Sequence, residues 1–181
     1  MRHAVGPRRE LGVRTLFNLL GPLTNPARAP NQLLGVFDAA WVEPLAQVLG
    51  ALGSRHVMVV HAEDGLDEIS IQTPTRVAEL RAGEVVNHVL TPEDFGVPRQ
   101  SLASLEIGSP DDSLALMREV LGGAVGAARD IVLVNAAAAL YVAGRATDLS
   151  AGMALAARAI DSGEAGRRLD ALVQRSQELA A

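Results

Sequence analysis

Residues 56–61 read HVMVVH, and this short stretch decides the fold. Its centre, Val57 to Val60, is an unbroken apolar run of strand length, with Gly53 before it and Gly65 after it as turn signals. A strand that shows one face to water alternates apolar and polar residues, whereas an unbroken run is typical of a strand covered on both faces in an α/β protein. We therefore predict an α/β fold with this strand inside the sheet.

The residues before this strand predict a strand followed by a helix. QLLGVF, at 32–37, is a short apolar run bounded by turn residues and is typical of a strand. Asp38 follows as a candidate N-cap, and Pro44 fits only the first turn of a helix that runs to about Leu52. The proline-rich stretch before residue 30 predicts mostly loop, with one short helical piece at 15–20.

After the central strand, short apolar segments separated by turns predict antiparallel strands, and the chain then becomes helical. Ser109 before Pro110 is typical of a helix start, with the serine as N-cap and the proline in the first turn. The complete order predicts a mixed central sheet flanked by helices. The strands are expected at 69–72, 75–80 and 84–90, a turn at 91–96, and the helices at 111–121, 127–142, 148–160 and 163–178.

The composition excludes several classes of function. A net charge of -5 argues against non-specific nucleic-acid binding, which needs a basic surface. The chain has no cysteine, which excludes disulfides and thiol catalysis, and all 16 basic residues are arginine, which excludes lysine Schiff-base chemistry. No apolar run of about 18 residues occurs, so no membrane span is expected. Without a secretory signal pattern at its start, the chain is expected to be cytoplasmic.

Residues 64–68 read DGLDE and place two carboxylates, Asp67 and Glu68, side by side at the start of a predicted strand. One interpretation is a polar turn; the other is a site for a cation. Mg2+ is the natural candidate, because it often takes one or two protein carboxylates and fills its other positions with water and phosphate oxygens. Adjacent residues of a strand point to opposite sides, so both could reach one ion only at a twist, which Gly65 would allow.

Other polar residues give weaker signals. Arg8 lies in a cluster with Arg9 and Arg14, which is either a solvated patch or a site for a carboxylate or phosphate. The four histidines lack H-x-x-x-H spacing, so no zinc site is expected, and His61 is expected to be structural or merely close to the DGLDE turn. Asn135 precedes four alanines, and the favoured interpretation there is close helix packing.

Five segments of the sequence are specific in combination, in their order and spacing: RRELGVRTLFNLLGPLTNP (8–26), QLLGVF (32–37), VVHAEDGLDEIS (59–70), TPEDFG (91–96) and LVNAAAALY (133–141). Together they resemble the anthranilate phosphoribosyltransferase family. Pro7 before Arg8 departs from the family's usual valine. The family's GTGGD and KHGN motifs do not occur in the sequence, so the resemblance implies roughly the C-terminal half of such an enzyme, without its N-terminal helical domain. Residues 1–181 are thus expected to be the C-terminal part of an α/β phosphoribosyltransferase catalytic domain.

The resemblance also implies roles for particular residues. Arg8 would pair with the anthranilate carboxylate, and Asp67 and Glu68 would hold a Mg2+ ion that bridges to the pyrophosphate of phosphoribosyl pyrophosphate. The segment at 18–26 would help frame the substrate channel. The reaction would transfer the phosphoribosyl group to anthranilate in tryptophan biosynthesis, in an enzyme that is a homodimer at full length. The chain alone is expected to be incomplete and inactive.

Two alternatives stay open. A pyrimidine nucleoside phosphorylase-like enzyme has a similar fold but uses phosphate. A non-catalytic ligand-binding or assembly module would use the fold without the reaction. The expected partners are the small-molecule substrates anthranilate and phosphoribosyl pyrophosphate, with no nucleic acid and no membrane.

Overall fold

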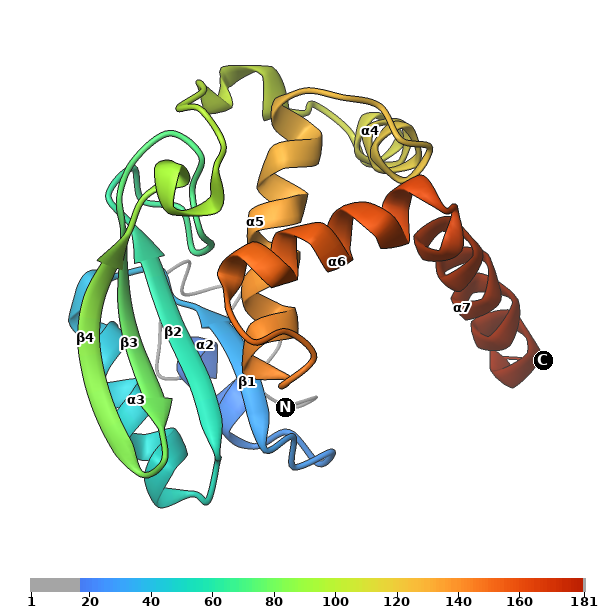
Figure 1. Ribbon diagram of the computed structural model, residues 1–181. Helices are drawn as coiled ribbons and strands as arrows, with labels where there is room; N and C mark the ends of the chain where they lie inside the picture. Colours follow the sequence, from blue (N-terminus) through green and yellow to red (C-terminus); the bar gives the residue numbers. More distant parts are fainter. Residues whose placement is uncertain (1–16, 181) are drawn as a thin grey trace.

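The predicted central strand is β2 (His56–Ala62), an inner strand of a four-stranded sheet of order β1-β2-β3-β4. We describe residues 17–180 from a computed structural model of the chain (Figure 1). β1 (Asn31–Gly35) runs parallel to β2, while β3 (Thr75–Arg81) and β4 (Glu84–Leu90) continue the sheet antiparallel. The sheet is therefore mixed, and the predicted fold class is confirmed.

Both faces of β2 are buried, as its unbroken apolar run predicted. Val57 and Val59 pack in a cluster with helix α3 (Val42–Ala51), and Met58 and Val60 pack on the opposite face with α5 (Ala127–Val142). Figure 1 shows the two helices on opposite sides of the sheet. All four side chains are at most 1 % exposed, so this strand lies in the interior of the domain.

The predicted helix starts are confirmed by their capping bonds. The Asp38 carboxylate accepts a hydrogen bond from the Ala40 amide at 2.9 Å and opens the 3-10 turn Ala39–Trp41 that leads into α3. Ser109 accepts one from the Asp112 amide at 3.1 Å at the start of α4 (Pro110–Leu121). Each cap satisfies amide groups that the first helical turn leaves without a partner.

The remaining helices extend the domain away from the sheet. α6 (Leu149–Asp161) crosses α5 so closely that a β-carbon at Gly152 would lie 2.6 Å from the Ala137 carbonyl oxygen. α7 (Glu164–Ala180) follows and projects outward with no buried residue, and α2 (Phe17–Leu23) lies at the other end of the described chain (Figure 1). Within residues 17–180, no helix combines the length and apolar character needed to span a bilayer.

The predicted strand at 69–72 is wrong. Ile69 and Ile71 are buried, as a strand pattern would require, but their segment lies in a loop between β2 and β3. Side chains take the place of a neighbouring strand: the Ser70 amide donates to Thr75 Oγ1 at 3.1 Å and the Gln72 amide donates to Ser70 Oγ at 2.9 Å. The apolar pattern predicted the burial correctly. The segment is not a strand because its backbone amides bond to side chains and not to a neighbouring strand.

A polar cluster fastens the C-terminal end of α5 to the sheet. Tyr141 donates from its hydroxyl to Glu79 Oε1 at 2.9 Å and accepts from Arg81 Nη1 at 2.8 Å. His56 Nε2 lies 2.8 Å from the same Glu79 oxygen, and its ring meets the Tyr141 ring edge-on with centroids 4.9 Å apart. The cluster connects β2, β3 and α5 at the end of the sheet where β2 begins.

Replacing Tyr141 with phenylalanine tests this connection. Tyr141→Phe removes both hydroxyl hydrogen bonds and keeps the ring, so we expect the free energy of unfolding to fall by about 1–2 kcal/mol. Urea denaturation followed by circular dichroism measures it, with an unchanged slope against urea as evidence that the fold is kept. An unchanged midpoint would show that the hydroxyl contributes nothing to holding α5.

Candidate functional site

The acidic pair lies in the loop that leaves the C-terminal end of β2. The backbone bends at Asp67 and Glu68, and both side chains are exposed. Within the described residues, neither carboxylate makes a hydrogen bond or an ion pair. Because the segment is not a strand, the rule that sends neighbouring side chains to opposite faces does not apply to this pair.

The loop is closed by its own side chains. Ser70 Oγ donates to Asp64 Oδ2 at 2.6 Å, and the Leu66 amide donates to Asp64 Oδ1 at 3.2 Å. Thr73 Oγ1 accepts from the Asp64 amide at 3.2 Å, which ties the two ends of the loop together. Gly65, with φ of +90°, turns the chain between these contacts. The Asp64 carboxylate is therefore engaged in hydrogen bonds within the loop, whereas the pair at 67 and 68 is available for another role.

Strand β1 fixes the loop from one side. A β-carbon built at Gly35 would lie only 1.5 Å from the carbonyl oxygen of Asp67, far inside van der Waals contact. Only a residue without a side chain allows this approach, so the glycine of QLLGVF is needed for space and not for an unusual backbone angle. The position of Asp67 is thus defined by the backbone of β1.

Helix α5 fixes the loop from the other side, through Asn135. The Asn135 Oδ1 accepts from the Ile69 amide at 2.9 Å, and its Nδ2 donates to the Ile69 carbonyl at 2.9 Å and to the Ile131 carbonyl at 3.0 Å. The sequence-based interpretation, close packing through alanine, missed this role. The available signal was a lone amide in an otherwise apolar helical segment, LVNAAAALY.

His61 has a structural contact beside the loop, as predicted. Its Nδ1 lies 2.8 Å from the Val36 carbonyl oxygen, which can only accept, so Nδ1 carries the hydrogen. This bond joins the end of β2 to the residue that follows β1. It reinforces the corner of the fold against which Asp67 is placed.

The electrostatics of the pair favour a cation. Glu68 is solvent-exposed, yet nearby protein atoms remove part of its hydration, and this desolvation is the main cause that raises its pKa; the negative charge of Asp67 raises it further. Among residues 17–180, no cluster of three or more potential metal-binding side chains occurs. Two carboxylates that find no partner in the described part of the chain fit a hard ion such as Mg2+, which completes its shell with water and phosphate oxygens.

The described part of the 18–26 segment, which was expected to frame the substrate channel, is not brought to the pair. Arg8 lies outside the described residues. The end of the 18–26 segment lines an open hollow of about 550 Å3 at the N-terminal end of β1, whereas Asp67 lies beside Gly35 at its C-terminal end. The structure therefore does not bring this part of the segment to the acidic pair. The hollow is lined by Pro22, Leu23, Thr24, Asn25, Pro26, Arg28, Ala29, Pro30, Gln32, Leu49, Leu52, Gly53 and Ser54.

Gly35→Ala tests the close approach of strand and loop. The new methyl group overlaps the Asp67 carbonyl, so the loop must move, and we expect a loss of about 1–3 kcal/mol or more in the free energy of unfolding. NMR shifts of the Asp67 and Glu68 amides should change together with it. Gly166→Ala is the matched control, because a β-carbon there meets nothing within 4 Å and alanine favours the helix. Equal behaviour of the two variants would contradict the packing described.

Asp67→Asn tests whether the charge of Asp67 affects the pKa of Glu68. Removing the neighbouring negative charge makes ionisation of Glu68 easier, so the pKa of Glu68 should fall. It should stay above the ordinary glutamate value, because desolvation, the larger cause, is kept. An NMR pH titration of the Glu68 side-chain carboxyl measures both values. An unchanged Glu68 pKa would show that the side chains point apart.

Comparisons with known proteins show which family this sequence and fold resemble. The anthranilate phosphoribosyltransferase of Thioalkalivibrio sulfidiphilus is 64% identical over 173 residues, which are 96% of this chain and 51% of that protein. The crystal structure of the Thermus thermophilus anthranilate phosphoribosyltransferase superposes with a TM-score of 0.87 at 44% identity, covering 96% of this chain and 51% of that one.

A more distant solved structure has ligands named with it. It is the anthranilate phosphoribosyltransferase from Saccharomyces cerevisiae in complex with PRPP and Mg, with a TM-score of 0.81 at 29% identity, covering 94% of this chain and 49% of that one. The chain thus spans about half the length of the relatives that it matches. Residues 1–166 match the family described as the glycosyl transferase family, a/b domain. The chain belongs to this family.

Proposed function

We propose that this chain carries the cation-binding part of an anthranilate phosphoribosyltransferase. The reaction transfers the 5-phosphoribosyl group from phosphoribosyl pyrophosphate to the amine of anthranilate, giving N-(5-phosphoribosyl)anthranilate and pyrophosphate in tryptophan biosynthesis. The observation that carries the proposal is the acidic pair of Asp67 and Glu68, held by β1 and α5 and without a partner among residues 17–180, in a chain 64% identical to an enzyme of this name. The relatives' names favour this activity over that of a pyrimidine nucleoside phosphorylase.

Asp67 and Glu68 are the residues that would hold Mg2+. When bound, the ion neutralises negative charge that develops on the departing pyrophosphate. The protein contributes position: because the loop is already fixed by Gly35 and Asn135, the carboxylates need little reorganisation when the substrate binds. The yeast relative's complex with PRPP and Mg supports the same assignment.

Arg8 is proposed to hold the second substrate. A guanidinium pairs with a carboxylate through two parallel hydrogen bonds and so fixes the orientation of the ring that carries it. The amine of anthranilate is neutral and needs no general base to attack. The new carbon–nitrogen bond forms at the anomeric carbon of the ribose as its bond to the pyrophosphate oxygen breaks, and the nitrogen then loses a proton to solvent. The homodimer implied by the resemblance and the cytoplasmic location expected from the sequence stay predictions.

A fusion protein tests the proposed activity. The half of the Thioalkalivibrio sulfidiphilus relative that this chain does not match is joined ahead of Met1, and consumption of anthranilate with phosphoribosyl pyrophosphate and Mg2+ is followed. We expect turnover by the fusion and none by the chain alone, because the phosphate-binding GTGGD motif is not in its sequence. A fusion that folds and binds both substrates without turnover would overturn the proposed reaction.

Variants of the fusion assign the roles. Asp67→Asn with Glu68→Gln should raise the Mg2+ concentration needed for half-maximal rate by roughly 10-fold or more, as expected when metal-binding groups are lost. Arg8→Ala should raise the KM for anthranilate more than that for phosphoribosyl pyrophosphate. An unchanged Mg2+ titration would contradict the metal assignment, and equal changes in both KM values would contradict the role of Arg8.

A further inference from the structure

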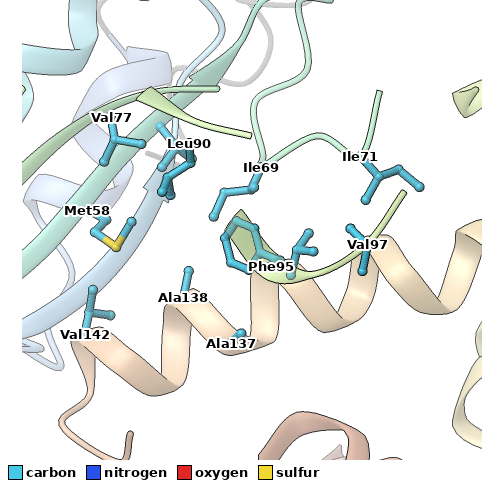
Figure 2. Close-up of a cluster of buried hydrophobic side chains, with 12 residues drawn as sticks. Met58, Ile69, Ile71, Val77, Leu90, Phe95, Val97, Ala137, Ala138 and Val142 are labelled. Carbon is cyan, nitrogen blue, oxygen red and sulfur yellow. The ribbon is translucent and has the colours of Figure 1, made fainter. Parts of the chain in front are cut away.

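The side-chain amide of Asn135 bonds to the backbone of Ile69 in the way that a neighbouring strand would, and we call this contact the clamp. A strand neighbour satisfies both the amide and the carbonyl of the residue opposite it, and the Asn135 amide does the same for Ile69. The residue held in this way directly follows Glu68. Its side chain is only 1 % exposed and packs in the cluster with Phe95, Ala137 and Ala138 (Figure 2), so Ile69 is fixed at both backbone and side chain.

The third contact of Asn135 gives the clamp its rigidity. Its Nδ2 also donates to the carbonyl of Ile131, one turn earlier in α5, which holds the amide group in one orientation. α5 is in turn packed against β1 and β2 on one side and α6 on the other. Any displacement of Ile69 therefore has to break hydrogen bonds to a helix that is itself held in the core.

The placement of the acidic pair depends on this clamp because the two carboxylates have no polar contact among residues 17–180 that would hold them. Within the described part of the chain, neither carboxylate is held by a hydrogen bond or ion pair. Their position is set on one side by the approach of Asp67 to Gly35 and on the other by Ile69. Without the hydrogen bonds from Asn135, Ile69 would keep its buried side chain but its backbone would no longer be held to α5, so Glu68 could shift relative to Asp67.

We propose that Asn135 is a positioning residue for the cation site: through Ile69 it holds Glu68 beside Asp67 so that both carboxylates can bind one divalent ion. The inference rests on the proposed function, because it deepens the role of the same pair. Asn135 itself touches neither the ion nor a substrate. Its contribution is to the geometry of the ligands, and its loss should weaken cation binding while the domain stays folded.

Two substitutions of Asn135 separate geometry from charge. Asn135→Ala removes all three hydrogen bonds. Asn135→Asp keeps an acceptor for the Ile69 amide but sets a carboxylate oxygen against the carbonyls of Ile69 and Ile131. The aspartate also adds a negative charge, which alone would strengthen cation binding, so weaker binding by this variant can come only from lost placement. Tyr141→Phe is the matched control, since it removes hydrogen bonds from the same helix nearer its C-terminal end.

Binding is measured with Mn2+ on the full chain, by the loss of the free-ion electron paramagnetic resonance signal and by selective broadening of the Asp67 and Glu68 amide resonances. Both Asn135 variants should bind Mn2+ roughly 10-fold more weakly than the unsubstituted chain, as is typical when a partner that orients metal ligands is removed. Tyr141→Phe should bind as the unsubstituted chain does. Thermal unfolding of each sample records that it is folded at the temperature of the titration.

A measurement on the unsubstituted chain supports the proposal if the variants fail to fold. If Mn2+ binds only when the loop is clamped, hydrogen exchange of the Ile69 amide should slow roughly tenfold at an ion concentration ten times its Kd. The control amide is Ala40, bonded to Asp38 on the opposite side of the sheet, and it should not respond.

The outcomes are distinct. Equal Mn2+ affinity of the Asn135 variants and the unsubstituted chain, or equal weakening by Tyr141→Phe, would overturn the role of Asn135 and leave the proposed function standing. Unchanged Ile69 exchange in the presence of bound Mn2+ would do the same. No binding of Mn2+ by the unsubstituted chain would overturn the metal assignment, and the role of Asn135 with it.

Discussion

The closest backbone approach in the site is between the end of β1 and the carbonyl of Asp67, and the rest of the site depends on it. Position 35 can be occupied only by glycine there, because any β-carbon would overlap the Asp67 oxygen. Gly35 also pairs with Val60 in the parallel ladder, so its own position is set by the strand that is buried on both faces. The buried core therefore fixes the acidic loop through backbone contacts, without any long side chain in between.

This arrangement explains why a loop can serve as a rigid site. Loops carry functional groups more often than regular elements do, but they are usually more mobile. Here the loop has buried residues of its own, Ile69 and Ile71, and polar side chains that satisfy its backbone. Figure 2 shows both isoleucines lying against α5 with Phe95 and Val97. The exposed carboxylates thus stand on a segment whose next residue belongs to the hydrophobic core.

Much of the fold could be predicted from the sequence because its signals are local. The apolar run of β2, the caps at Asp38 and Ser109 and the glycines between helices all act within a few residues. The failures have long-range causes. The 69–72 segment has the composition of a strand, but its amides bond to side chains, and Asn135 lies 66 residues from the Ile69 groups that it binds. Asp67 and Glu68 were singled out from their pairing beside a glycine turn and Arg8 from a cluster of arginines, whereas the substrate assigned to Arg8 came from the family resemblance.

The two carboxylates of the acidic pair repel each other in the folded chain. Desolvation and the charge of Asp67 raise the Glu68 pKa, so the ionised carboxyl is less favourable in the folded chain than in the unfolded one. That penalty is present at neutral pH and disappears as the pH falls through the raised pKa, because protonated Glu68 carries no charge. A bound cation reverses the sign, since it stabilises the ionised form of both groups. A pair that only closed a turn would be more stable with its carboxylates pointing apart or paired with an arginine. This pair is held by Gly35 and Asn135 and has no partner in the described chain, which fits the proposed binding of a cation.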